Sequence, residues 1–289
     1  MLIRPPSMLV SVYLATRNRQ ELLARAIDSV LAQTYSHVEL VVADDASTDD
    51  TREYLRGLQD DGKLVCLHLP VSMGACVARN LAIASCRGEF ITGLDDDDYF
   101  EPERIEKFIS VWCALGEGER RSGIAGLFDS MVTLREDRRQ IRHGQLRVSH
   151  RELLEQNLVG GFIFAPRAHY FEAGLYDTRM PAWQDWDLWV RISRRFGDFV
   201  NILSNTYVAD ESHVHGRIST RPAFMIRHAR DLFEHQHGPL NRRQRSSLLL
   251  CCLHYPQVRP TLSDLVELAL AGRLHFLATQ IRRLMPRLS

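Results

Sequence analysis

The sequence predicts an α/β protein built around a largely parallel sheet. Short β-branched apolar runs alternate with segments whose apolar residues recur at helical spacing, which is the pattern of repeated βαβ units. Polar clusters follow the runs at 8–14, 38–43 and 89–94, where the strands of such a sheet would end. The composition, 45% hydrophobic and 25% charged, is that of an ordinary globular chain.

The expected elements follow in chain order. The first half should contain strands at 8–14, 38–43, 64–69 and 89–94, a helix over Leu22, Leu23, Ala26, Ile27, Val30 and Leu31, and a helix around 75–85. After residue 100 we expect a helix at 102–115, apolar runs at 124–134 and 161–165, and a helix at 185–196. This second half should complete the sheet and build another pocket.

The charge changes sign near residue 216. Residues 1–216 hold 24 basic and 32 acidic side chains, whereas residues 217–289 hold 12 and 4. In the basic part, apolar residues of one helix lie near one face: Leu262, Val266, Ala269, Leu277, Ile281, Leu284 and Leu288. This extension could pack on the rest of the chain, lie on an anionic membrane, or bind another subunit. It carries no nucleic-acid-binding motif, so we expect no nucleic-acid partner.

Cysteine usage and the N-terminus indicate the compartment. The six cysteines have no framework spacing, which favours a reducing environment. The first apolar run is interrupted by Arg4, Pro5 and Pro6 and is too short for a signal peptide or a span. We expect a cytoplasmic protein, with attachment to the inner face of the membrane left open.

Four successive carboxylates, Asp95 to Asp98, follow the run at 89–94. Such charges repel one another unless a cation or hydrogen-bond donors compensate. Alternate residues at a strand end share a side, so Asp95 and Asp97 could bind Mg²⁺ or Mn²⁺. The other interpretation is a solvated acidic turn. No Walker loop is present, and the segment ATRNRQ after the first run lacks the glycines of a dinucleotide fingerprint.

Three blocks of sequence resemble the inverting family 2 glycosyltransferases. They are SVYLATRNRQELLARAIDSVLAQTYSHVELVVADDASTDDT, MGACVARNLAIASCRGEFITGLDDDDYFEPERIEKF and GGFIFAPRAHYFEAGLYDTRMPAWQDWDLWVRISRRFG, in the family's order between about 8 and 215. The resemblance implies a GT-A fold, a nucleotide-sugar donor with UDP favoured, and a glycan or lipid-linked glycan acceptor. It also implies a donor-binding half at 1–98, an acceptor-binding half at 99–216 and the basic extension at 217–289.

The resemblance assigns roles to individual residues. Asp97 is the favoured metal ligand, with Asp95 and His215 beside it, and Asp95 or Asp96 would bind the ribose. Asp45, next to Asp44, would hydrogen-bond the nucleobase of the donor. The rest of the donor site is expected to consist of Ala15, Thr16, Arg17, Asn18, Arg19, Asp44 and Arg79.

On the acceptor side, Asp185 would be the general base. It would take the proton of the acceptor hydroxyl, and a single displacement would invert the anomeric centre. The acceptor is expected to contact Gly160, Gly161, Trp183, Gln184 and Trp186. His213 is a weaker donor-site candidate than His215.

Two other functions are open at this point. A non-catalytic module that binds a nucleotide sugar or a glycan would keep the aspartate run but would need no base, so Asp185 discriminates. A sugar nucleotidyltransferase would carry a glycine-rich loop with Arg and Lys after the first strand, which ATRNRQ is not.

Overall fold

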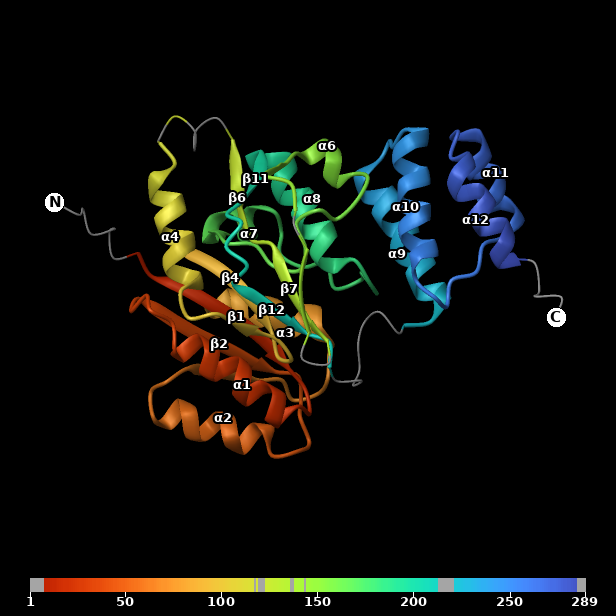
Figure 1. Cartoon of the computed structure of the whole chain (residues 1–289). Coiled ribbons are helices and arrows are strands. Elements are labelled where there is room, and N and C mark those ends of the chain that lie inside the picture. Colours follow the sequence, from red (N-terminus) through yellow and green to blue (C-terminus); the bar gives the residue numbers. More distant parts are fainter. Residues whose placement is uncertain are drawn as a thin grey trace.

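The computed structural model describes residues 8–116, 118, 123–135, 138–142, 144–212 and 221–284. An α/β region carries its C-terminal helices at one side (Figure 1). The elements of residues 8–116 are β1 (Val10–Thr16), α1 (Gln20–Leu31), β2 (Val38–Asp44), α2 (Thr51–Asp60), β3 (Val65–His68), α3 (Ala75–Ser85), β4 (Phe90–Asp95), β5 (Tyr99–Phe100) and α4 (Arg104–Ala114).

The remaining elements lie between residues 123 and 284. They are β6 (Ile124–Phe128), β7 (Met131–Arg135), β8 (Arg138–Arg142), β9 (Arg147–Val148), α6 (His150–Leu153), β10 (Ala165–Pro166), α7 (Arg167–Glu172), α8 (Gln184–Phe196), β11 (Asp198–Asn201), β12 (Tyr207–Asp210), α9 (Ala223–His237), α10 (Arg242–His254), α11 (Leu262–Leu270) and α12 (Leu274–Leu284).

The main sheet has the strand order β10-β4-β1-β2-β3. β1 pairs in parallel with both β2 and β4, with Thr16 opposite Asp44 and Ala15 opposite Asp95. The chain order reverses between β1 and β4, and ligands of open α/β sheets bind at such switch points. The parallel sheet is therefore confirmed, and its register brings the polar strand ends to one edge.

The second half was only partly predicted. Of its described strands, β10 alone joins the main sheet, and it runs antiparallel to β4. The others form a three-stranded sheet, β6-β11-β9, and a four-stranded sheet, β5-β12-β7-β8. The expectation that this half completes the main sheet was thus largely wrong, because its short apolar runs do not specify which sheet they pair with.

One glycine permits close packing over the main sheet. A Cβ atom added to Gly93, in the middle of β4, would lie 2.2 Å from the Phe162 ring and 2.5 Å from the Tyr13 ring. Tyr13 and Phe162 are buried and meet edge to face, with ring centroids 5.9 Å apart. The missing side chain at this position allows both rings to lie against the strand.

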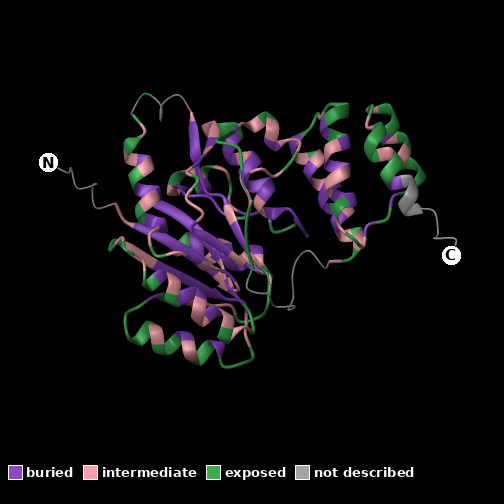
Figure 2. Cartoon of the chain, in the orientation of Figure 1, coloured by how far each residue is buried: buried purple, intermediate pink, exposed green. Residues whose placement is uncertain are grey.

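The C-terminal helical extension is present, but its last part differs from the expectation. Residues 262–284 form two helices, separated at Gly272, whose φ of +70° lies in the left-handed region. Glycine at that backbone conformation commonly ends a helix. Figure 2 shows that exposed residues predominate on α11 and α12, whereas the main sheet is buried.

Candidate active site

The site lies at the edge where β1, β2 and β4 end. A cavity of about 750 Å³ opens there. Its lining includes most of the expected donor residues and several others: Ala15, Thr16, Arg17, Asn18, Arg19, Asp45, Ser72, Gly74, Ala75, Ala78, Arg79, Asp95, Asp96, Asp97, Asp98, Met131, Ala209, Asp210, Glu211 and Arg221. The sheet register thus brings together three polar segments that are far apart in the sequence.

Three of the four aspartates form one acidic cluster. Oxygen atoms of Asp95, Asp97 and Asp98 all lie within 4.8 Å of one another. Tyr207 donates to Asp98 at 2.6 Å, and the backbone N–H of Asp210 donates to its other oxygen at 2.9 Å. Burial, together with Asp95 and Asp97, raises the pKa of Asp98 well above its ordinary value. Three clustered carboxylates are suitable ligands for Mg²⁺ or Mn²⁺, whose charge would relieve their repulsion.

Asp96 is not part of this cluster, and its hydrogen-bond partners lie at the end of β1 and in the loop that follows. It accepts hydrogen bonds from Thr16 at 2.8 Å and from Arg19 at 2.9 Å. Burial raises its pKa to about 6, although Arg19 and Thr16 act in the opposite direction. Arg19 also contacts Asp97 at 3.1 Å. Arg19 thus holds the first loop against the acidic run.

Asp44 and Asp45 at the end of β2 are both buried and hydrogen-bonded. Asp44 accepts from the Ser47 backbone at 3.0 Å and pairs with His68 at 3.1 Å. Asp45 lines the cavity, and the segment 72–74 donates to it three times: from the Ser72 hydroxyl at 2.8 Å and from the backbone N–H groups of Met73 at 2.7 Å and Gly74 at 3.0 Å. Asp45, which is expected to bind the nucleobase, thus also anchors the turn before α3.

Arg79 connects the acidic cluster with Asp185. One guanidinium nitrogen lies 2.6 Å from Asp95, and another lies 3.4 Å from Asp185. The Arg79 guanidinium also lies over the rings of Phe162 and Tyr176, at 5.6 and 5.4 Å from their centroids. Because Arg79 is only 6% exposed, its position is determined by these neighbours.

Asp185 is in the first turn of α8, and 25% of its side-chain surface is exposed. Burial raises its pKa to about 6; Arg79 opposes the shift, Asp95 adds to it, and a hydrogen bond from Tyr176 lowers it. The Tyr176 hydroxyl is also 2.6 Å from that of Tyr13 on β1. A general base works best when its pKa is near the operating pH, so the environment of Asp185 suits that role.

The expected acceptor-side residues lie near Asp185 but are largely packed. Trp183 is 9% exposed, Gln184 2% and Trp186 3%. Both tryptophan rings contact Phe233 of α9, and Trp186 donates to the Leu153 carbonyl at 2.6 Å. The carbonyl of Gly160, next to Gly161, accepts from Trp189 at 2.9 Å. Acceptor contacts through the Trp183 and Trp186 rings remain a prediction, since here the rings join α8 to the extension.

Some expectations fall outside the described residues, and other site residues were not anticipated. His213 and His215 lie outside the described part of the chain. Tyr176, Asp210 and Arg25 were not singled out from the sequence; Arg25 pairs with Asp210 at 2.5 Å and donates to the Asp97 carbonyl at 2.7 Å. No local motif marks these residues, because their partners are distant in the sequence.

The fold and this site place the chain among nucleotide-sugar glycosyltransferases. It belongs to glycosyl transferase family 2, whose sequence profile matches residues 11–163. The GT-A fold is confirmed by solved structures of 16–18% sequence identity. TarS 1-349 of S. aureus superposes with a TM-score of 0.65 over 93% of this chain and 83% of that chain, at 16% identity. The mannosyltransferase PcManGT of Pyrobaculum calidifontis, in complex with GDP-Man and Mn²⁺, gives 0.59 over 99% and 84%, at 18% identity.

Two relatives in Escherichia coli are closer in sequence. One is the glycosyl transferase WcaA of strain K12, whose name places it in colanic acid biosynthesis; it is 32% identical over 74% of this chain and 76% of its own length. The other is the UDP-Glc:alpha-D-GlcNAc-diphosphoundecaprenol beta-1,3-glucosyltransferase WfaP. It is 35% identical over 35% of this chain and 40% of its own length.

Within the described residues, every helix is either too short or too polar to cross a bilayer.

Proposed function

We propose that the protein is an inverting transferase that moves a hexosyl or N-acetylhexosaminyl group from a UDP-sugar to a hydroxyl of a glycan acceptor. The observation that carries this proposal is the arrangement around Arg79. This arginine bridges the acidic cluster, where a donor diphosphate would bind, and Asp185, a carboxylate whose pKa is raised to about 6. This arrangement supports a donor site and a general base on two sides of one buried side chain.

In the proposed reaction, the acceptor oxygen attacks the anomeric carbon while the bond from that carbon to the diphosphate breaks. The hydroxyl proton passes to the Asp185 carboxylate. Mg²⁺ or Mn²⁺ held by Asp95, Asp97 and Asp98 would supply Lewis-acid stabilisation of the leaving diphosphate. Arg79 and Tyr176 keep Asp185 oriented. Asp45 and the 72–74 segment form the wall of the cavity that is assigned to the nucleobase of the donor.

The proposed acceptor belongs to surface polysaccharide biosynthesis and is attached to a lipid. WcaA is named for colanic acid biosynthesis, and the name of WfaP gives a diphosphoundecaprenol-linked sugar as its acceptor. A lipid-linked acceptor requires the enzyme to work at a membrane surface, and the proposed surface for that contact is formed by α11 and α12.

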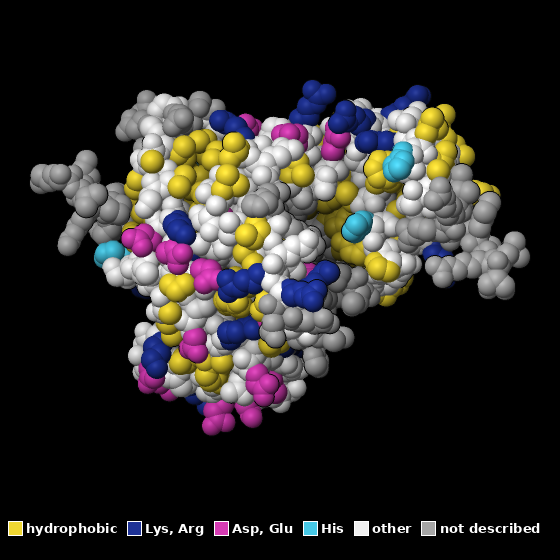
Figure 3. Space-filling model, viewed as in Figure 1, with side chains coloured by type: hydrophobic (Ala, Val, Ile, Leu, Met, Phe, Trp, Pro, Cys, Tyr) yellow, Lys and Arg dark blue, Asp and Glu magenta, His cyan; other side chains and the backbone are white. Residues whose placement is uncertain are grey.

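The surface of α11 supports this contact. Leu262, Val266 and Leu270 are 79%, 58% and 66% exposed and follow one another at intervals of four residues, so they form one apolar stripe. Hydrophobic side chains gather over α11 and α12 (Figure 3). Because residues 217–289 carry 12 basic and 4 acidic side chains, the favoured surface is an anionic one.

The substitution Asp185→Asn tests the central proposal. It removes the base but keeps the size of the side chain, so transfer should fall by roughly 10²–10⁴-fold. Binding of UDP with Mn²⁺, measured by calorimetry, should be unchanged. The matched control is Asp61→Asn, at the exposed end of α2, which should leave both unchanged. Transfer that survives Asp185→Asn would refute the role of this base.

A further inference from the structure

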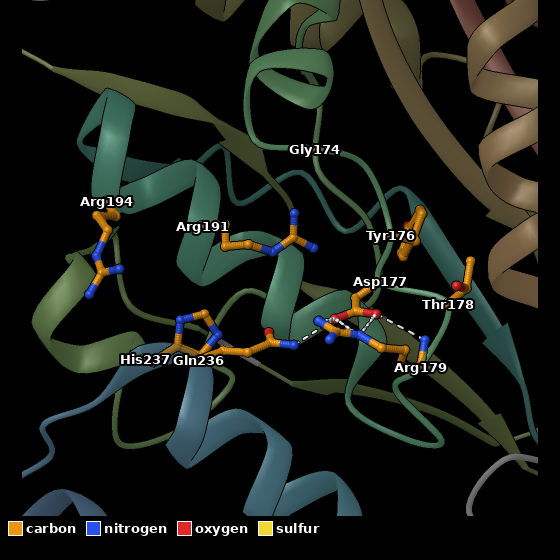
Figure 4. A pocket seen from close by; sticks show the side chains of 9 residues that line it. All are labelled: Gly174, Tyr176, Asp177, Thr178, Arg179, Arg191, Arg194, Gln236 and His237. Carbon is orange, nitrogen blue, oxygen red and sulfur yellow. Dashed lines mark hydrogen bonds and ion pairs between the residues drawn. The ribbon is translucent and has the colours of Figure 1, made fainter.

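A second cavity, of about 520 Å³, lies between α8, the loop at 174–179 and the end of α9. Figure 4 shows Arg191 and Arg194 extending from α8, with Gln236 and His237 extending from the end of α9. The lining consists of Gly174, Tyr176, Asp177, Thr178, Arg179, Arg191, Arg194, Gln236 and His237. We call this cavity the α8–α9 pocket.

A fully buried carboxylate, that of Asp187, holds two of the side chains that line the α8–α9 pocket. Asp187 accepts from Arg191 at 2.7 and 3.1 Å through one oxygen and from His237 Nε2 at 2.9 Å through the other. The negative charge of Asp187 is therefore paired within the protein. Arg191 also donates to the Ala173 carbonyl, so the guanidinium is fixed on both sides. The pocket is thus preorganised before any ligand arrives.

The carboxylate on the pocket wall is also occupied. Asp177 accepts from Arg179 at 2.7 Å and from Gln236 at 2.5 Å. Asp177 and Asp187 thus offset two of the three arginines, Arg179 and Arg191. The third, Arg194, is exposed at the rim and has no ion-pair or hydrogen-bond partner among the described residues. The pocket therefore keeps an excess positive charge.

His237 lines the pocket with one of its two ring nitrogens paired, since Nε2 contacts Asp187. The residue is 3% exposed, and its Nδ1 atom makes no hydrogen bond within the described part of the chain. Because Nε2 faces Asp187, the ring geometry directs Nδ1 away from that carboxylate. Buried polar groups are normally hydrogen-bonded, so the pairing of His237 is incomplete on the side away from Asp187. Because Nε2–H donates to Asp187, Nδ1 of the neutral ring is an acceptor, and it is enclosed by protein atoms, so it offers no donor to an anion. The side chain available to an anion in this pocket is the guanidinium of Arg194, whose N–H groups suit a phosphate oxyanion.

The α8–α9 pocket is adjacent to the acceptor side of the active site. Tyr176 lines the pocket, and its hydroxyl hydrogen-bonds the general base candidate Asp185. Arg191 and Arg194 follow Asp185 on the same helix, about 9 and 14 Å along its axis at 1.5 Å per residue. The donor diphosphate is assigned to the acidic cluster, on the other side of Arg79. An anion in this pocket would therefore belong to a different substrate.

We propose that the α8–α9 pocket binds a phosphate or diphosphate group carried by the acceptor, an inference that rests on the proposed transferase function. The group anchors the acceptor so that its sugar hydroxyl reaches Asp185. Arg194 supplies the contact, and Arg191, Gln236 and His237 complete the wall.

The test compares Arg194→Gln with Arg195→Gln. Arg195 is the next residue on α8, is 57% exposed, pairs with Glu172 and lies outside the pocket. The probes are inorganic pyrophosphate and an alkyl diphosphate ester, titrated calorimetrically in the presence of a chelator to silence the acidic cluster. Arg194→Gln should lower the affinity for both probes by roughly tenfold, which is the loss expected for one charge-assisted hydrogen bond. Arg195→Gln should leave both affinities unchanged.

Other outcomes overturn the proposal. Equal affinities in the two variants would exclude the pocket as the site. Binding of pyrophosphate without binding of the ester would identify a site for a free anion rather than for an acceptor. Arg194→Lys serves as a second variant and should weaken the binding of both probes less than Arg194→Gln does, because it keeps the positive charge. UDP binding with Mn²⁺ is measured in parallel: its absence from the unsubstituted protein would refute the proposed function, whereas its persistence with no effect of Arg194→Gln would refute this inference alone.

Discussion

At the residue scale, the chemistry depends on how the protein controls the charge of Asp185. The carboxylate is partly buried beside a second acidic group, and both factors oppose ionisation. Arg79 and Tyr176 act in the opposite direction. The result is a pKa of about 6, which lies between that of an ordinary aspartate and physiological pH.

This pKa predicts the pH dependence of transfer. The base must be ionised, so kcat/KM should rise with pH through about 6 and then level off. The same carboxylate gives the free energy of unfolding the opposite pH dependence, a decrease with rising pH. Its pKa in the folded protein is above that in the unfolded chain, so its contribution to stability is present at low pH and is lost as the pH rises through about 6.

The variant Tyr176→Phe removes the hydrogen bond from Tyr176 to Asp185 and leaves the other influences on the pKa of Asp185 in place. The bond stabilises the ionised form of Asp185, so its removal should raise the pKa and move the acidic limb of the kcat/KM profile to higher pH. A pH–rate series on both proteins measures the shift. Tyr54→Phe, on α2, is the control and should keep the original limb. A limb that stays in place in Tyr176→Phe would show that another group controls it.

At the element scale, β4 positions the site through both its end and its middle. Its end carries Asp95, and its middle, at Gly93, accepts the Tyr13 and Phe162 rings. Tyr13 contacts Tyr176, which in turn contacts the general base candidate. A change in the packing of this strand should therefore affect catalysis as well as stability.

The pair Gly93→Ala and Gly57→Ala tests this dependence. At Gly93 the new methyl group would collide with two rings, so we expect a loss of roughly 1–3 kcal/mol in the free energy of unfolding and a lower kcat. At Gly57, inside α2, no atom of the described residues lies within 4 Å of the added Cβ, apart from the chain neighbours and the backbone of the helix itself. There the same substitution should stabilise the protein by roughly 0.5–1 kcal/mol without changing kcat. Urea denaturation and initial rates measure both effects.

The apolar stripe of α11 has its own test at this scale. The triple variant Leu262→Ser, Val266→Ser and Leu270→Ser should no longer float with vesicles of anionic lipid, because it loses the exposed apolar face. Neutral vesicles should bind the original protein less. Leu31→Ser, at an exposed leucine of α1, should float normally. Retention of vesicle binding by the triple variant would place the membrane contact elsewhere.

At the scale of the whole molecule, donor and metal should stabilise the fold together. A ligand that binds only the folded state raises the free energy of unfolding by about 2.7 kcal/mol when its concentration is a hundred times its Kd. A panel of nucleotide sugars with Mn²⁺ should therefore raise the melting temperature most for a UDP-sugar. Asp97→Asn should abolish the dependence on Mn²⁺, because Asp97 belongs to the acidic cluster. Asp60→Asn, at the end of α2, should retain it. A stronger response to another nucleotide would refute the UDP assignment.

Local patterns in the sequence were sufficient for the α/β class and for much of the donor side. The helix expected around 75–85 is Ala75–Ser85, and the run at 89–94 is observed as Phe90–Asp95. Such elements are predictable because their hydrophobic period depends only on neighbouring residues. The break at Gly272 was missed because the apolar residues on its two sides happen to keep a similar spacing.

Tertiary structure alone decided the relations between distant residues. The sequence by itself determined the strand ends, the aspartate run and the family resemblance that selected Asp185. Only the folded chain placed Arg79 between Asp95 and Asp185, buried Trp183 and Trp186 against Phe233, and grouped Arg194 with His237. The physical reason is that side-chain charge, burial and pairing depend on packing between segments far apart in the sequence, which no local pattern encodes.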